Sequence, residues 1–277
     1  MKKFLIFSIS FLIVMVLLLS TGVAVYSAAS GEDKSSLSQN ARQNKGTVSI
    51  SNETKELIRL SDKKNYDTNI VNYTELLTQL NVHEKYINEM GRLLKEEHKI
   101  SDILTAYSFL NDKFGRLQEI ETLIKEKESG KAWTDIFKEY NKKNPEFVPG
   151  SFETGYLEEL MKAPGITADD IMLADRVSQK TGKTMQEVME KRMVGETWKD
   201  INAWLDIVNG DEALLRVSVS PEQIDKYVNA GMDRDVVVEG YVIANKLNQK
   251  AEIVINELKT GTSVEKLLDK YYTQKYY

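Results

Sequence analysis

Histidine, cysteine and paired acids supply most enzyme chemistry, and this chain is poor in the first two. It has two histidines, His83 and His98, and no cysteine. The chain therefore has no cysteine for a Cys-His centre and only two histidines that could serve a Ser-His-Asp centre. Neither histidine belongs to a His-Glu-x-x-His pattern. We predict no metal site, and we expect both histidines to lie on solvated helix surfaces.

Two acidic pairs, Glu158-Glu159 and Asp169-Asp170, are the remaining candidates for hydrolytic chemistry. Glycosidase carboxylates must flank a cleft at about 5 to 10 Å. Adjacent residues on a helix point in different directions, so neither pair alone makes that arrangement, and acidic helix starts explain them better. Phosphate-binding loops are also missing, because Gly182-Lys-Thr lacks the earlier glycine of the Walker pattern. We predict no catalytic residue and no cofactor site.

The first thirty residues have the order of an export signal. Two lysines precede an apolar stretch over residues 4–25, and the small residues Ser27 and Ala29 follow. Small side chains at this spacing fit the subsites of a signal peptidase. About 20 apolar residues also suffice to cross a bilayer, so a retained membrane anchor is the alternative to cleavage. We predict a secreted or extracytoplasmic protein that touches membrane only through this segment.

Charge and cysteine usage narrow the class of partner. The formal net charge is −5, and removal of the two signal lysines changes it to −7. An acidic chain is poorly suited to bind phosphate backbones by bulk charge. The best candidate for a DNA-reading helix begins Thr197-Trp-Lys-Asp and lacks the basic and amide side chains needed, so we predict no nucleic-acid partner. Export without cysteine suits a Gram-positive envelope protein whose fold depends on burial alone.

A block of about 66 residues occurs three times, and each copy closes with a related pattern. The closing pattern begins at Gly130, Gly195 and Gly261, each followed three residues later by tryptophan or valine. Such repetition indicates divergence of one packed unit. We predict that one recurring set of side chains fills the space between helices: Trp133, Ile136, Trp198, Ile201, Val264 and Leu267.

Each block is predicted to contain four short helices, because its apolar residues recur at intervals of three and four. Thr184 and Glu187 form a capping-box pattern, while Gly182 and Gly195 stand where helices end. We therefore predict an all-α fold in which the copies form an array, each packed on the next, with a compact bundle as the alternative.

The chain divides into five predicted segments. The stretch after the signal is polar, and it buries too little surface to offset the entropy of ordering, so we predict a disordered linker there. The segments are a signal or anchor at 1–29, the linker at 30–67, and helical repeats at 68–150, 151–216 and 217–277.

One string carries a resemblance to a known repeat. Residues 180–188, Lys-Thr-Gly-Lys-Thr-Met-Gln-Glu-Val, followed by Gly-Glu-Thr-Trp-Lys-Asp-Ile at 195–201, resemble a helical repeat of exported proteins from Gram-positive spore-forming bacteria. The similarity is strongest in the second copy and loosest in the third, where Val264 replaces tryptophan. This resemblance implies an architecture and a habitat, and it transfers no catalytic residue.

Trp204 is not explained by the repeat, because Glu139 and Lys270 occupy its position in the other copies. An exposed tryptophan there would be a candidate contact for a partner or a glycan. The alternative, which we favour, is that it covers the neighbouring helix beside Ile201 and Leu205. The tyrosines of the C-terminal tail present the same choice: Tyr272, Tyr276 and Tyr277.

These observations favour a non-catalytic interaction module that presents a rigid helical surface to an envelope protein or a cell-wall glycan. Two alternatives stay open. A carboxylate-dependent cell-wall hydrolase requires a cleft with two acids at catalytic separation. A passive envelope spacer requires no exposed apolar patch.

Overall fold

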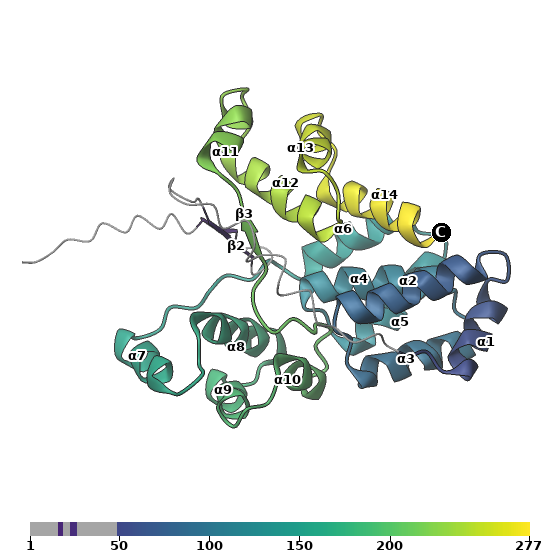
Figure 1. The fold of residues 1–277 in the computed structure, drawn as a ribbon, viewed down its shortest axis with the longest axis horizontal. Coiled ribbons are helices and arrows are strands. Elements are labelled where there is room, and N and C mark those ends of the chain that lie inside the picture. The colour runs from purple at the N-terminus through teal and green to yellow at the C-terminus, as the bar shows by residue number, and fades with distance from the viewer. Residues whose placement is uncertain (1–15, 19–22, 27–48) are drawn as a thin grey trace, which may run out of the picture.

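The computed structural model describes residues 16–18, 23–26 and 49–277, and helices dominate this part of the chain (Figure 1). Two helices come first, α1 (Asn52–Ser61) and α2 (Tyr66–Gln79). Twelve more follow, so the described ranges contain fourteen helices. The predicted all-helical class is confirmed.

The twelve later helices come in three consecutive groups of four, which we name the first, second and third helical sets. The first set comprises α3 (Glu84–Lys95), α4 (Ile100–Lys113), α5 (Leu117–Glu128) and α6 (Trp133–Lys143). The second set comprises α7 (Thr154–Lys162), α8 (Ala168–Thr181), α9 (Met185–Met193) and α10 (Trp198–Trp204). The third set comprises α11 (Pro221–Val228), α12 (Arg234–Lys246), α13 (Ala251–Lys259) and α14 (Val264–Tyr276).

The turn before the last helix of each set has the same backbone geometry. Gly130, Gly195 and Gly261 have φ values of 98°, 95° and 86°. The N–H of Gly195 donates to the Arg192 carbonyl, and equivalent bonds, three residues back, form at the other two glycines. Residues other than glycine rarely adopt positive φ, and this explains why glycine stands at each of these helix ends.

The helix boundaries agree with the sequence signals in the second set. Thr184 and Glu187 form the predicted capping box at the start of α9. Gly182 ends α8 in the left-handed conformation, with φ of 75°. These local signals depend on hydrogen bonds within a few residues, and for that reason they can be identified without a tertiary structure.

The first set lies at the centre of the molecule and contacts both others (Figure 1). Helix α14 of the third set packs on α6, α4 and α2, and its Tyr272 and Tyr276 join the same core as Trp133 and Phe137. The second set joins the first through backbone hydrogen bonds, including Val208 N–H to the Gly115 carbonyl at 2.8 Å. This arrangement differs from the expected array, because the third set packs on the first and not chiefly on the second.

A small sheet connects the N-terminal part of the chain to the third set. Strands β1 (Val16–Leu18) and β2 (Val23–Tyr26) are antiparallel, and β2 runs parallel to β3 (Arg216–Ser218). Strands β1 and β2 lie within the predicted signal or anchor, and the rest of that segment lies outside the described residues. No helix in the described ranges is long and apolar enough to cross a membrane.

The predicted linker at 30–67 extends too far toward the C-terminus. Its last part forms α1 and the first turn of α2, and Ile58 is completely buried in the central core. Ser51 caps α1 by accepting a hydrogen bond from the Thr54 N–H. The scattered apolar residues of this polar stretch therefore pack against the first set. The local composition did not indicate this contact. Residues 30–48 lie outside the described part.

Candidate functional site

The predicted packing anchors lie at the start of the last helix in each set. Val264 is partly buried and packs against the central core. The other five have at most 1% of their surface exposed: Trp133, Ile136, Trp198, Ile201 and Leu267. These side chains therefore serve packing, and a ligand has no access to them.

In the second set, the indole of Trp198 is tied to a buried carboxylate. Its Nε1–H donates to Asp170 Oδ1 at 2.7 Å, and Arg192 Nε donates to the same oxygen at 2.7 Å. Burial raises the pKa of Asp170, but hydrogen bonds from Thr167, Trp198 and Arg192 outweigh it and hold the pKa below its ordinary value. The three side chains connect the starts of α8 and α10 with the end of α9.

The first set has the same arrangement with one residue inserted. Trp133 Nε1–H donates to the hydroxyl of Tyr277 at 2.7 Å, and that hydroxyl donates to Asp102. Lys127 takes the place of Arg192, with its Nζ 5.9 Å from the Trp133 ring centroid. Asp102 and Asp170 both stand three residues after their helix N-caps. Tyr277 thus bridges the tryptophan and the carboxylate that are in direct contact in the second set.

The third set has apolar residues at all three positions. Val236 stands three residues after the N-cap of α12, and Leu258 and Val264 occupy the positions of Arg192 and Trp198. The third set therefore lacks the carboxylate, the cation and the indole donor at the same time. Their joint absence is expected of side chains that satisfy one another, because a buried polar group left alone is costly.

The tail tyrosines predicted as candidate partner contacts are mostly core residues. Tyr272 and Tyr276 are 6% and 4% exposed, which contradicts the expectation of a surface role. Their rings are stacked, and Tyr272 also meets Phe137 edge-on. Tyr277 has 49% of its surface exposed, although its hydroxyl is bonded inside the first set. Helix α14 turns these rings into the central core, a long-range contact that the tail sequence did not reveal.

Trp204 remains partly accessible. Its exposed fraction is 43%, and the ammonium groups of Lys191 and Lys183 lie 4.5 and 5.7 Å from its ring centroid. The ring is thus covered in part by lysine side chains and in part free. An isolated exposed ring of this kind is common on protein surfaces, so it does not by itself define a binding site.

The two histidines differ from the solvated surface residues that were expected. His98 is 8% exposed, and its Nδ1 lies 2.7 Å from Glu128 Oε1. His83 caps α3 by accepting a hydrogen bond from the Lys85 N–H. Burial of His98 follows from the packing of the α3–α4 turn against α5, which the residues around it did not indicate.

Glu96, His98 and Glu121 bring potential metal ligands within 4.8 Å of one another. The guanidinium of Arg92, however, already donates to both carboxylates at 2.6 Å. This cation neutralises the acids in place of a metal ion. The cluster is therefore an ion-pair network between α3 and α5 and is not proposed as a metal site.

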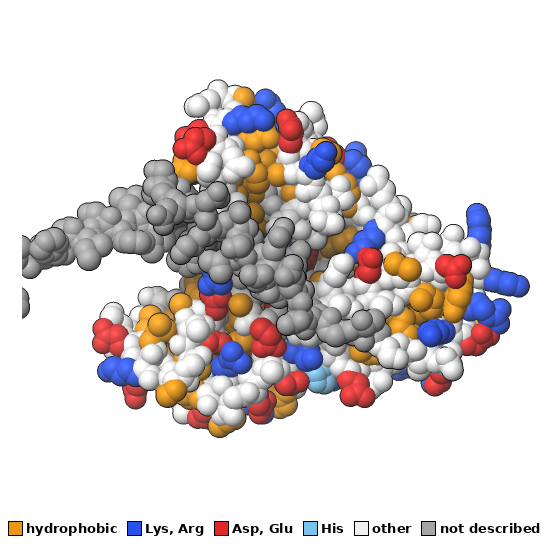
Figure 2. Space-filling model, in the orientation of Figure 1, with side chains coloured by type: hydrophobic (Ala, Val, Ile, Leu, Met, Phe, Trp, Pro, Cys, Tyr) orange, Lys and Arg blue, Asp and Glu red, His pale blue; other side chains and the backbone are white. Residues whose placement is uncertain are grey.

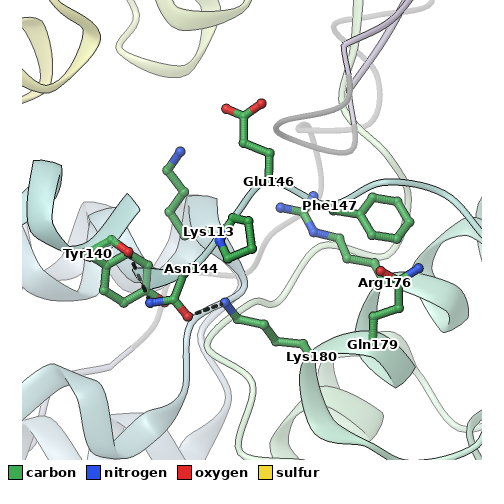
Figure 3. A pocket seen from close by; sticks show the side chains of 9 residues that line it. Lys113, Tyr140, Asn144, Glu146, Phe147, Arg176, Gln179 and Lys180 are labelled. Carbon is green, nitrogen blue, oxygen red and sulfur yellow. Dashed lines mark hydrogen bonds between the residues drawn. The ribbon is translucent and has the colours of Figure 1, made fainter. Parts of the chain in front are cut away.

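A pocket of about 330 Å³ lies between the first and second sets, and we name it the basic pocket (Figure 3). Among the described residues, its lining comes from the ends of α4 and α6, the segment after α6, and α8: Lys113, Tyr140, Asn144, Pro145, Glu146, Phe147, Arg176, Gln179 and Lys180. Three of these are cations and one is an acid. In Figure 3 the Glu146 carboxylate points away from Arg176 and Lys180.

Arg176 is the most unusual group of the basic pocket. Its side chain is 5% exposed, and Nη1 is buried without a hydrogen-bond partner. The guanidinium carbon lies 3.9 Å from the centroid of the Phe114 ring and 5.8 Å from that of Phe147. Two aromatic rings thus lie near the guanidinium, and its Nη1 has no hydrogen-bond partner among the described residues. A buried cation in this state is costly unless something else pairs with it.

The electrostatics of the basic pocket favour a negatively charged ligand. Burial lowers the pKa of Arg176 to about 10. Burial also lowers the pKa of Lys113, with repulsion from Lys246 and Arg176 contributing. Burial, followed by the nearby cations Arg176 and Lys113, lowers the pKa of Lys180. Nearby acids oppose each shift, Asp112 and Glu146 at both Arg176 and Lys113, and Glu119 at Lys180, but burial outweighs them. An anion placed among the three cations would therefore be stabilised.

Sequence reasoning missed the basic pocket, although one local signal pointed to it. Arg176 lies on the buried face of α8, flanked by Leu173, Ala174 and Val177, which are all completely buried. A charge inside an apolar helical stripe is uncommon and suggests a special role. The other lining residues include Lys113, which is 63 positions from Arg176 along the chain, so their convergence depends on the tertiary fold.

Comparison with known proteins finds no matching family model, no similar curated protein and no similar solved structure. The geometry of the basic pocket is therefore the basis on which a function can be proposed.

Proposed function

We propose that this chain is a non-catalytic, extracytoplasmic helical-repeat module that binds an envelope component through an anionic group held in the basic pocket. The observation that carries the proposal is Arg176, a buried guanidinium whose Nη1 has no described hydrogen-bond partner, beside two further cations. The contact with the Phe114 ring leaves this Nη1 donor unused. A bound anion would use it.

The wider surface supports recognition at one site over binding by bulk charge. Figure 2 shows lysine, arginine and acidic side chains interspersed over the visible face. The chain as a whole is acidic, with a formal net charge of −5. Long-range attraction of a polyanion is therefore weak, and binding has to depend on a local cluster of cations. The proposed partners are an envelope protein or a cell-wall polymer that carries such an anionic group.

The proposed scaffold is a 66-residue unit copied three times, exported by the N-terminal segment. Its support is the recurrence of four helices per set, the three glycines with positive φ, and the Asp–Trp link, which is direct in the second set and bridged by Tyr277 in the first. The basic pocket uses residues from two of the sets. A repeat therefore supplies the framework, and the junction between copies supplies the site.

The hydrolase alternative has less support. It requires two carboxylates that flank a cleft. Among the described lining residues of the basic pocket, Glu146 is the single acid, and its carboxylate points away from the cations. Asp102 has a pKa raised by burial, but its carboxylate accepts a hydrogen bond from Tyr277 inside the first set. The spacer alternative is compatible with the aromatic contacts of Arg176 but gives no acceptor to its buried Nη1.

Thermal unfolding in the presence of small anions tests the proposal. Because a ligand that binds only the folded state raises stability with concentration, sodium acetate or sodium phosphate should raise the Tm of the full chain, with sodium chloride at equal ionic strength as reference. Arg176→Gln should abolish the increase. Arg59→Gln, at a half-exposed arginine of α1, is the matched control and should retain it. The same Tm in all three salts would refute the proposal.

A further inference from the structure

We infer that the group bound in the basic pocket is the free carboxylate of a short peptide, and not a phosphate. This inference rests on the function proposed above and specifies its ligand. Three features of the pocket lead to it: the fixed plane of the Arg176 guanidinium, the polarity of the helix ends around it, and its apolar walls.

The first feature is the orientation of Arg176. The rings of Phe114 and Phe147 lie 3.9 and 5.8 Å from its guanidinium carbon and restrict the plane of the group. A guanidinium donates two parallel hydrogen bonds to a planar carboxylate lying in its own plane. Lys180 Nζ, which donates to Asn144 Oδ1 at 3.1 Å, points into the same space (Figure 3). The two parallel N–H donors of Arg176 and the ammonium group of Lys180 can together bind one carboxylate.

Phe114 holds this geometry through an unusual backbone conformation. It follows α4 with φ of 51°, in the left-handed region that residues other than glycine seldom occupy. Such a residue costs about 1–2 kcal/mol and persists only where its surroundings demand it. The ring is 5% exposed and is in contact with Arg176. The strained residue therefore provides the ring that lies nearest to the guanidinium.

The second feature is the polarity of the surrounding helices. Lys113 is the last residue of α4, Asn144 follows the last residue of α6, and Lys180 is the penultimate residue of α8. Three helix C-termini thus converge on the pocket, and each contributes partial negative charge. Phosphate sites usually place helix N-termini and their N–H groups toward the ligand, and none of these helices does so. A dianion is disfavoured here, whereas a single negative charge is balanced by the cations.

The third feature is the size and apolar wall of the pocket. Its volume of about 330 Å³ exceeds what a carboxylate alone fills. The Tyr140 ring, Pro145 and Phe147 provide non-polar surface beside the cations. Small-molecule sites commonly combine such walls with a few charged groups that fix the orientation. A carboxylate attached to one or two small residues, as at the end of a peptide chain, satisfies both parts of the pocket.

Calorimetric titration of the full chain with three probes tests this inference. The probes are N-acetyl-alanyl-alanine with its free carboxylate, the same dipeptide as a carboxamide, and phenyl phosphate. We expect the carboxylate to bind at least tenfold more tightly than either other probe, because a lost charge-assisted hydrogen bond costs about tenfold or more. Arg176→Lys keeps the positive charge but removes the two parallel N–H donors of the guanidinium, and it should weaken carboxylate binding by about tenfold.

The outcomes separate this inference from the function on which it rests. Tighter binding of phenyl phosphate that depends on Arg176 would overturn the carboxylate assignment and leave the anion-binding proposal intact. Binding of none of the probes, by a wild-type chain with a normal unfolding transition, would overturn the carboxylate assignment; combined with no anion effect on Tm, it would overturn both. Equal affinity for the dipeptide and its carboxamide would show that the peptide and not its charge is recognised. The Tm of Arg176→Lys, compared with that of wild type, confirms that the variant is folded.

Discussion

Replacement of Trp198 by valine introduces into the second set the residue that the third set has at the same position. In the third set, Val264 is accompanied by the apolar residues Val236 and Leu258. In the second set, Asp170 and Arg192 would remain after the substitution and would lose the indole that covers them. The effect should therefore depend strongly on whether these two companions are changed as well.

The magnitude follows from burial and hydrogen bonding. Trp198 is completely buried, and large-to-small substitutions of buried aromatic residues cost about 3–5 kcal/mol. Loss of the Nε1–H donor also leaves Asp170, 2% exposed, with one partner fewer, at about 1–3 kcal/mol. The two contributions sum to about 4–8 kcal/mol, and because local relaxation reduces the sum, we expect a loss of about 4–6 kcal/mol for Trp198→Val. The triple variant that adds Asp170→Val and Arg192→Leu removes the stranded charges, so its loss should be smaller than the sum of the three single losses by about 1–3 kcal/mol.

Urea unfolding followed by far-ultraviolet circular dichroism measures these differences. The wild type, the three single variants and the triple variant form one series, and Trp204→Phe serves as a control at a half-exposed tryptophan. The control should change the free energy of unfolding by less than about 0.5 kcal/mol. Strict additivity across the series would show that Asp170, Arg192 and Trp198 do not form a coupled unit. It would refute the explanation given for the joint absence of such side chains from the third set.

Three further predictions concern other parts of the fold. Tyr277→Phe should lower the free energy of unfolding by about 1–3 kcal/mol in urea titrations, because it strands Trp133 Nε1 and Asp102; an unchanged midpoint would contradict the bridging role. Burial raises the pKa of Asp102 above its unfolded value, so the stability of the wild type relative to Asp102→Asn should be greatest below the ordinary pKa and should fall as the pH rises through the raised pKa; midpoints measured at pH 3 and pH 7 with an equal difference would exclude this. Gly195→Ala, at φ of 95°, should cost about 1–2 kcal/mol by thermal unfolding, whereas Gly91→Ala, inside α3 with open space around it, should be neutral or stabilising; equal effects would remove the conformational explanation.

Helix existence and helix ends were predictable from local sequence, and the reason is their short range. The capping box of Thr184 and Glu187 and the left-handed glycines are made within a single turn of chain. The burial of Trp133, Trp198 and Leu267 was predictable as well, since a recurring apolar position marks a face that must be covered. The polar stretch before α2 was misjudged, because Ile58 gains its partners from the first set and not from its neighbours in the sequence.

The sequence by itself determined the helical class and the capping signals at several helix ends, such as those of α8 and α9. Only the tertiary structure decided that α14 returns to the first set and buries Tyr272 and Tyr276, and that Arg176 meets Lys113 and Lys180 around one pocket. The division has a physical cause. Capping and apolar periodicity act over a few residues, whereas the pairing of helix surfaces depends on shape and charge brought together from distant parts of the chain.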